Sequence, residues 1–167
     1  FDRLDLVFAT TKDLQSKVVE SGIPLSHIVR IPNMVRLPEK PIEHKVKKDG
    51  DTLIIGSMGR MIERKGFAQL IEAMAKIKAF TRVPFKLVIG GDGEEKTALE
   101  KLVKKHKLEN HVEFCGWVTD KADFFQRCDV FCLPSLHEPF GIVLLEAMAY
   151  STPIVAYDCE GPHDIFM

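Results

Sequence analysis

The stretch that decides the fold reads Leu133-Pro-Ser-Leu-His-Glu138-Pro-Phe-Gly141-Ile-Val-Leu-Leu-Glu146-Ala-Met-Ala-Tyr150. It predicts the end of a strand, a proline-containing loop and then an apolar helix. We expect this helix to be buried nearly all round, and Glu146 is its only charged side chain. A carboxylate in apolar surroundings is costly unless another group pairs with it or hydrogen-bonds to it. Glu146 is therefore a candidate for contact with a polar ligand, although pairing with a core lysine or arginine would also satisfy it.

A second carboxylate, Glu138, lies in the loop before the same helix. Between the two acids, the free backbone N–H groups of a helix start would attract phosphate. The residues that would supply them are Phe140, Gly141, Ile142 and Val143. Two carboxylates flanking an anion site suit a ligand with hydroxyl groups at both ends and phosphate in the middle, as in a nucleotide sugar. Taken alone, Glu138 would more often be a carboxylate on a loop surface.

Composition argues against several classes of function. The chain has 167 residues, 46% of them apolar, which is enough for one domain with a real core. A net charge of −1 gives no overall field that would attract nucleic acid. No apolar run approaches the ~20 residues of a membrane-spanning helix. We expect no signal peptide, and because the chain starts with Phe1 rather than Met, we expect it to be a piece of a longer protein.

The cysteines and lysines bear on where the protein works. Cys115, Cys128 and Cys132 lie in or beside apolar strand-like runs, as buried free thiols do in a reducing compartment. The four cysteines have no metal-ligand spacing, so we expect a cytoplasmic protein and assign no metal site. The lysines within 96–107 are best explained as a solvated helix face, and peripheral contact with the inner face of a membrane is a lesser alternative.

Strands and helices alternate along most of the chain. Strands are predicted at 4–10, 28–31, 53–57, 85–90, 112–115, 130–133 and 153–157. Helices are predicted at 67–79, 94–106, 120–126, 141–150 and, capped by Thr11, up to about Glu20. This alternation predicts the α/β class, with a Rossmann-like, doubly wound parallel sheet covered on both faces. Ligands of such sheets bind at the carboxyl ends of the strands. Four unusual loops would gather there: 58–66, 90–93, 116–118 and 134–141.

A charged stretch with two prolines interrupts this alternation before the regular pattern begins. Such composition, with almost no apolar periodicity, is typical of a linker. We therefore divide the chain into residues 1–34, a linker over 35–51, and a ligand-binding sheet domain over 52–167.

The sheet domain resembles the C-terminal domain of GT-B-fold glycosyltransferases, specifically the retaining enzymes of glycosyltransferase family 4. The resemblance spans about 52–165 and rests on four motifs in combination, since the glycine-rich turn alone would be weak. The motifs are Gly59-Arg60 with Lys65-Gly66, the turn Gly90-Gly91-Asp92-Gly93, Phe114-Cys-Gly116, and the pair Glu138 and Glu146 with seven residues between them. By the same likeness, 1–34 would end the family's N-terminal acceptor domain and 35–51 would be its hinge.

The resemblance implies a role for each motif. Arg60 and Lys65 would hold the diphosphate of a nucleotide-sugar donor and offset the charge of the leaving group. Glu138 would meet a hydroxyl of the transferred sugar, and Glu146 would accept hydrogen bonds from the ribose. Arg60, Lys65 and Glu138 are thus the candidate catalytic residues. The candidate donor-binding residues are Gly59, Gly91, Gly116, Trp117, Val118, Phe140, Gly141, Ile142, Val143 and Glu146.

The resemblance also implies the reaction and its partners. The donor would be a UDP-sugar or GDP-sugar, the loop 116–118 would lie along the nucleobase, and Trp117 would be half core and half base platform. The transferred group would be hexosyl or N-acetylhexosaminyl, with retention of configuration and without a protein-bound metal or further cofactor. The acceptor would be a glycan or a lipid-linked glycan, in lipopolysaccharide or other cell-envelope polysaccharide synthesis.

Parts of the family's pattern have no counterpart in this sequence. The segment 161–165 resembles the family's Gly-Pro-Glu-Ile stretch, but the final strand and closing helices that follow it in the family are missing. Most of the N-terminal acceptor domain is missing as well. We therefore expect a sheet domain truncated at the C-terminus, and a chain that does not transfer sugar by itself.

Other functions fit the sequence less well. Two glutamates could be the acid and nucleophile of a glycosidase, but Arg60 and Lys65 would then have no role. The main alternative is a dinucleotide-binding Rossmann module. Against it, Gly56-Ser-Met-Gly59-Arg60 is not Gly-x-Gly-x-x-Gly, and no acid ends the second strand of the sheet domain. A scaffold without a ligand would leave Glu146 unexplained.

Overall fold

A five-stranded parallel sheet is the main element of the computed structural model, which describes residues 5–39, 47–48 and 50–167. Its strands lie in the order β5-β4-β3-β6-β7. They are β3 (Leu53–Met58), β4 (Phe85–Gly90), β5 (Val112–Gly116), β6 (Val130–Leu133) and β7 (Ile154–Ala156). Every neighbouring pair is parallel. The predicted α/β class and doubly wound sheet are confirmed.

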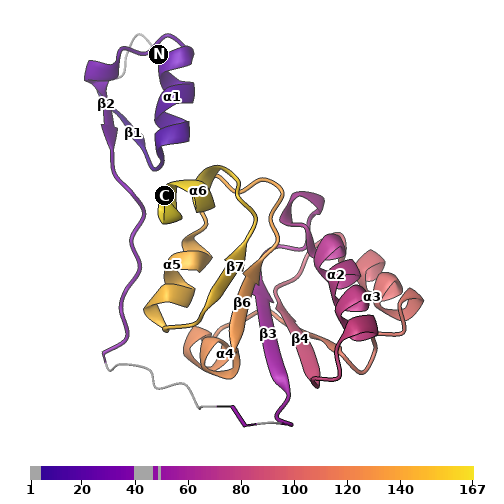
Figure 1. Cartoon of the computed structure of the whole chain (residues 1–167). Helices are drawn as coiled ribbons and strands as arrows, with labels where there is room; N and C mark the ends of the chain where they lie inside the picture. The colour runs from indigo at the N-terminus through magenta and orange to yellow at the C-terminus, as the bar shows by residue number, and fades with distance from the viewer. Residues whose placement is uncertain (1–4, 40–46, 49) are drawn as a thin grey trace.

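Helices cover both faces of this sheet (Figure 1). One apolar cluster joins the sheet to α2 (Phe67–Phe80) and α3 (Lys96–Lys105), and a second joins it to α4 (Lys121–Arg127) and α5 (Ile142–Ala149). Side chains of a strand alternate between its faces. Along β4, Leu87 and Ile89 accordingly belong to the first cluster and Val88 to the second. The near-continuous apolar strands in the sequence follow from this burial on both faces.

A smaller unit precedes the sheet domain. It consists of β1 (Val7–Ala9), α1 (Lys12–Glu20), a 3-10 turn η1 (Leu25–His27) and β2 (Ile28–Arg30). β1 and β2 pair in parallel over a small cluster of Ala9, Ile23 and Ile28. Thr11 caps α1 as predicted, because its hydroxyl accepts the N–H of Leu14 at 3.1 Å. Figure 1 shows an extended segment leading away from this unit. The linker predicted at 35–51 lies partly outside the described residues, so the domain boundaries remain predictions.

Three elements were not predicted, η1 among them, and several strands are shorter than expected. β1 covers Val7–Ala9 rather than 4–10, whose first residue lies outside the described part of the chain. A 3-10 turn η2 (Glu63–Lys65) lies inside the loop after β3. The helix α6 (Glu160–Phe166) contains Gly161-Pro162 in its first turn, where no element was predicted. Proline is compatible with the first turn of a helix, since N–H groups there have no intrahelical partner.

The expectation that the helix at 141–150 is buried nearly all round is wrong. In α5, Leu144 and Ala147 are buried, whereas Ile142 and Met148 are exposed. The helix lies on one face of the sheet and therefore buries one stripe of side chains. Elsewhere, the described part of the chain contains no helix of the length and apolarity needed to cross a membrane.

The cysteines differ in solvent exposure more than their sequence context suggested. Cys128 is buried and Cys132 partly buried, but Cys115 is exposed because β5 is an edge strand of the sheet. Burial raises the pKa of Cys128 to about 12 and that of Cys132 to about 11. Burial also raises the pKa of Cys115.

These environments predict unequal thiol reactivity. Alkylation requires an accessible thiolate. Iodoacetamide at pH 8 should therefore modify Cys115 at least about tenfold faster than Cys128 or Cys132 in the native protein, as followed by peptide mass spectrometry. In urea, the three thiols should react at similar rates. Equal rates in the native protein would contradict the packing described here.

Candidate active site

A cleft of about 1070 Å³ opens at the carboxyl ends of β3 and β6. These strands are neighbours in the sheet, yet the chain continues from β3 to β4 on one side and from β6 to β7 on the other. The segments that follow the two strands therefore diverge, and such a switch point is where open α/β sheets bind ligands. Residues of the loops 58–66 and 134–141 line this cleft together, at the strand ends where the sequence placed both loops.

The cleft collects nearly all of the predicted site residues. Twelve of the thirteen candidates line it, and Gly116 is the exception. Eight further residues line it that we did not predict: Thr10, Asn33, Met58, Arg64, Asp92, Gly93, Lys121 and Pro139. Arg64 could have been included from its place beside Lys65. Lys121 carries no comparable signal, because it is the first residue of a helix that is distant in sequence from the motifs.

Gly116 lies outside the cleft lining and hydrogen-bonds to the glycine-rich turn that lines it. Its carbonyl accepts the N–H of Gly91 at 2.6 Å. Gly91 has a φ of +116°, and a Cβ built there would lie 2.0 Å from the carbonyl oxygen of Gly59. A side chain is excluded by this close approach and by the backbone conformation. The glycine-rich turn 90–93 can therefore pack directly against the loop that carries Arg60.

Glu138 and Lys65 form an ion pair within the cleft. Their side chains are only 11% and 17% exposed, so Glu138 is not a loop-surface carboxylate. The Ser135 hydroxyl lies 3.4 Å from the same carboxylate oxygen of Glu138. The N–H of Leu136 donates to the carbonyl of Arg64 at 2.9 Å, which ties the two loops together. The pair thus spans the two walls of the switch-point cleft.

Glu146 also has a cationic partner, which is the alternative that the sequence left open beside contact with a ligand. It forms an ion pair with Lys121, at the start of α4. α4 and α5 share one face of the sheet, which brings the lysine within reach. The Glu146 side chain is 14% exposed and that of Lys121 47%. Both line the same cleft as Arg60, so the carboxylate does not face away from it.

Trp117 is 78% exposed, which corrects the expectation that half of it lies in the core. It follows the edge strand β5, where no further strand covers it within the described sheet. Together with Val118 it forms part of the cleft lining. An exposed indole in a cleft offers a flat apolar surface on which a planar ring can stack.

The start of α5 faces cations across the cleft. Gly141 precedes the helix, and no side chain of the described residues caps its first N–H groups. These N–H groups and the helix dipole favour a negative charge at this end. Arg60, Arg64 and Lys65 line the same cleft. The arrangement can hold an anion between a helix start and a basic loop. Among the described residues, no cluster of His, Cys, Asp or Glu could hold a metal ion.

Comparison with known proteins identifies the family of this chain. Residues 39–167 match the family described as Glycosyl transferases group 1. The chain belongs to this family. Two lipopolysaccharide core biosynthesis glycosyltransferases of Rhizobium meliloti (strain 1021) are similar to this group 1 chain. LpsE is 42% identical over 118 residues, which are 71% of this chain and 33% of LpsE. LpsD is 32% identical over 164 residues, which are 97% of this chain and 46% of LpsD. The group 1 chain thus spans less than half the length of either relative.

Solved structures of GT-B glycosyltransferases share the fold of this group 1 chain. The apo form of the lipopolysaccharide outer core galactosyltransferase WaaB has a TM-score of 0.80 at 24% identity, over 98% of this chain and 46% of WaaB. HepE of Anabaena in complex with UDP and glucose has a TM-score of 0.79 at 23% identity, over 98% of this chain and 47% of HepE. The five-stranded sheet is consistent with the C-terminal half of a GT-B fold.

The pair of Lys65 and Glu138 predicts coupled effects on stability. Lys65→Met or Glu138→Gln should each lower the free energy of unfolding by about 1–3 kcal/mol, because the remaining buried group loses its partner. The double variant should lose less than the sum of the two single losses. Urea unfolding measures all three, with Lys17→Met of the exposed pair with Asp13 as a control that should leave the midpoint unchanged. Additive losses would contradict a direct pair.

Proposed function

We propose that this chain is the donor-binding part of a retaining glycosyltransferase, which transfers a sugar from a nucleotide diphosphate sugar to a glycan or lipid-linked acceptor. One observation carries the proposal: a single cleft brings together basic side chains, the start of α5 and two carboxylates. The names of the LpsE and LpsD relatives support glycosyl transfer. The HepE neighbour, solved with UDP and glucose, supports a nucleotide-sugar donor.

In this proposal the diphosphate lies between the basic loop and α5. Arg60 and Lys65 face it from one wall, and the N–H groups of Ile142 and Val143 face it from the other. As the glycosidic bond breaks, negative charge grows on the diphosphate, and fixed positive groups at that place lower the barrier. Lys65 then divides its contacts between the phosphate and Glu138. These cations belong to the chain itself, so the proposal assigns the protein no metal and no cofactor.

The two carboxylates would hold the two hydroxyl-bearing parts of the donor. Glu138 accepts a hydrogen bond from the transferred sugar, and Glu146 accepts from the ribose. For the ribose to bind, Lys121 must move aside or share the carboxylate, and its half-exposed side chain has room in solvent to do so. The base, uracil or guanine, would then stack on Trp117. Stacking of a base on an aromatic side chain is worth about 1–3 kcal/mol.

The transferred sugar retains its configuration if the diphosphate leaves and the acceptor hydroxyl attacks on the same side of the sugar. The leaving diphosphate can assist by accepting the proton of the incoming hydroxyl. We further propose that an acceptor domain outside this chain completes the cleft, since the chain covers 46% of LpsD and 33% of LpsE. The transferred group would be hexosyl or N-acetylhexosaminyl. Lipopolysaccharide or related polysaccharide assembly, in the cytoplasm or at the inner face of the membrane, is the proposed setting.

Ligand binding tests the donor site directly. UDP or GDP should bind and raise the melting temperature, whereas NAD should not. Arg60→Ala should weaken UDP binding by about 10–100-fold, through the loss of a charge-assisted hydrogen bond. Glu146→Ala should also weaken UDP binding but leave inorganic pyrophosphate binding unchanged, because pyrophosphate has no ribose. Calorimetric titration measures each affinity, with the α3 variant Glu100→Ala as a control away from the cleft. Tighter binding of NAD would favour the dinucleotide-binding alternative.

Catalysis should require more than the donor site. We expect the isolated 167-residue chain to bind donor without transferring sugar, because the acceptor is placed by the domain outside it. The test is to measure the release of UDP or GDP from the nucleotide sugar, with and without an acceptor glycan. The full-length parent is the active control. Sugar transfer by the isolated chain at a rate near that of the parent would contradict the proposal.

A further inference from the structure

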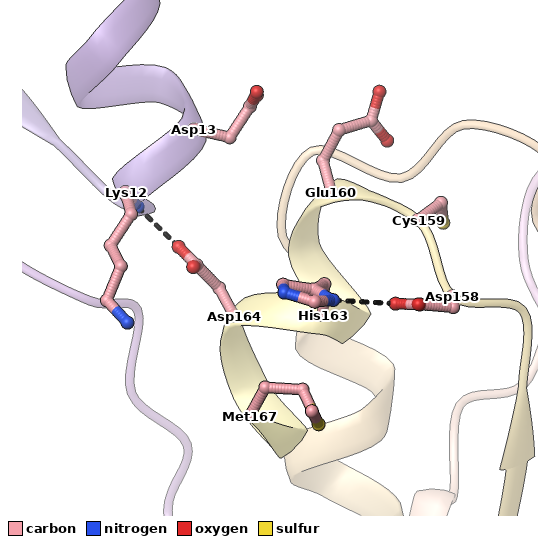
Figure 2. Close-up of a pocket in the computed structure, with 8 residues that line it drawn as sticks. All are labelled: Lys12, Asp13, Asp158, Cys159, Glu160, His163, Asp164 and Met167. Carbon is pink, nitrogen blue, oxygen red and sulfur yellow. Dashed lines mark hydrogen bonds and ion pairs between the residues drawn. The ribbon is translucent and has the colours of Figure 1, made fainter.

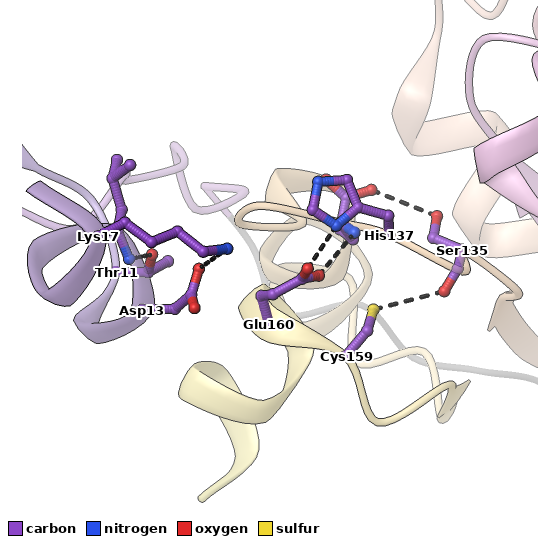
Figure 3. Close-up of polar contacts among 9 residues, drawn as sticks. Thr11, Asp13, Lys17, Ser135, His137, Cys159 and Glu160 are labelled. Atoms are coloured by element: carbon purple, nitrogen blue, oxygen red, sulfur yellow. Dashed lines mark hydrogen bonds and ion pairs between the residues drawn. The ribbon is translucent and has the colours of Figure 1, made fainter. Parts of the chain in front are cut away.

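Helix α6, which lies outside the cleft lining, hydrogen-bonds to the backbone of Glu138. The carboxylate of Glu160 accepts the N–H of Glu138 at 3.2 Å and also contacts Nδ1 of His137. In the reverse direction, the N–H of Gly161 donates to the carbonyl of Glu138 at 2.8 Å. The N–H and the C=O of Glu138 are thus both bonded to the first turn of α6. Figure 3 shows the Glu160 side chain directed at His137.

The first turn of α6 also packs tightly against the rest of this loop. The Cys159 thiol donates to the carbonyl of Ser135 at 3.4 Å (Figure 3). A Cβ built at Gly161 would lie 2.3 Å from the carbonyl oxygen of Phe140. Helix and loop therefore approach backbone to backbone from 135 to 140. A shift of either would break several of these contacts at once.

Contacts on its other side keep α6 itself in place. Asp164 accepts the backbone N–H of Lys12, at the start of α1 (Figure 2). His163 pairs with Asp158 at 2.8 Å, just before the helix. Figure 2 shows both contacts, from Asp164 to the start of α1 and from His163 to Asp158. Helix α6 is therefore bonded both to the loop that carries Glu138 and to the start of α1.

The ionised state of Glu160 suits its contacts with the loop that carries Glu138. Burial raises the pKa of its carboxyl, but hydrogen bonds from the N–H groups of Glu160 and Glu138, together with the contact to His137, outweigh that effect. The net pKa lies below the ordinary value, so the group is ionised at neutral pH. An ionised carboxylate can only accept hydrogen bonds. The loop supplies the donors that it needs.

We propose that Glu160 is a positioning residue for Glu138, and so for the sugar of the donor. The inference rests on the proposed function, in which the Glu138 side chain meets a hydroxyl of that sugar. The side chain reaches into the cleft toward Lys65, while its backbone is fixed from the opposite side by Glu160. Displacement of a binding group by about 1 Å can cost about 100-fold in rate. A residue outside the cleft lining can therefore control a group within it.

Hydrogen exchange tests the contact without any ligand. In Glu160→Ala, the peptide that covers 135–141 should exchange at least tenfold faster, because the Glu138 N–H loses its acceptor. Glu160→Gln keeps an oxygen that can accept this N–H and should change exchange less. Glu100→Ala is the control, since it removes an exposed acid of α3 that makes no contact with α6 or the loop, and exchange at 135–141 should not change. Unchanged exchange in Glu160→Ala would overturn the proposal.

Kinetics of the full-length parent separate positioning from mere folding. Glu160→Ala should lower kcat/KM for the nucleotide sugar about tenfold, while inhibition by UDP or GDP, which carry no sugar, changes less than threefold. If Glu160 acts through Glu138, adding Glu160→Ala to Glu138→Gln should cause little further loss. Fully additive losses would overturn the proposal. A wild-type protein that binds neither UDP nor GDP would instead refute the donor site, and the exchange experiment would still decide whether Glu160 fixes the loop.

Discussion

The arrangement of this molecule depends on one constraint of backbone topology. β3 and β6 lie side by side, but the chain leaves them toward opposite edges of the sheet. Their following loops therefore cannot pack on one another along their whole length, and the space between them is the cleft. The apolar clusters on the two faces of the sheet hold these strands in place, and the contacts of Leu136 with Arg64 and of Glu138 with Lys65 join the loops that follow them.

Paired charges make the cleft stable before a ligand arrives. Two carboxylates in a partly buried cleft would repel each other and lose hydration, and each is offset here by a lysine from a different element. Under the proposed function, the same pairing means that a donor would compete with protein contacts for Glu138 and Glu146. Binding therefore exchanges one set of polar contacts for another, and the net affinity depends on how well the ligand replaces the lysines.

Much of this could be predicted from the sequence, because periodicity reports which faces of strands and helices are buried. The sheet and its helices followed from apolar runs and from the loops that end them, whereas most candidate residues of the cleft came from the resemblance of four motifs to a known family. The partner of Glu146 did not, since Lys121 reaches it through helix packing that no local pattern records. The exposure of Trp117 and Cys115 depends on β5 being at the edge of the sheet, which the order of strands along the chain does not reveal. Helix α6 was missed because Gly161-Pro162 suits a turn as well as a first helical turn.

The exposure of Trp117 and Lys121 has a consequence for how such a scaffold diversifies. Neither side chain contributes to the two large apolar clusters, although both line the cleft. Replacing Trp117 changes the flat apolar surface of the cleft at little cost to folding, since exposed substitutions usually alter stability by less than about 0.5 kcal/mol. Replacing Lys121 costs more, because Glu146 then loses its ionic partner. Under the proposed function, related chains could therefore change their preference for the base through Trp117 while the strands beneath it stay the same.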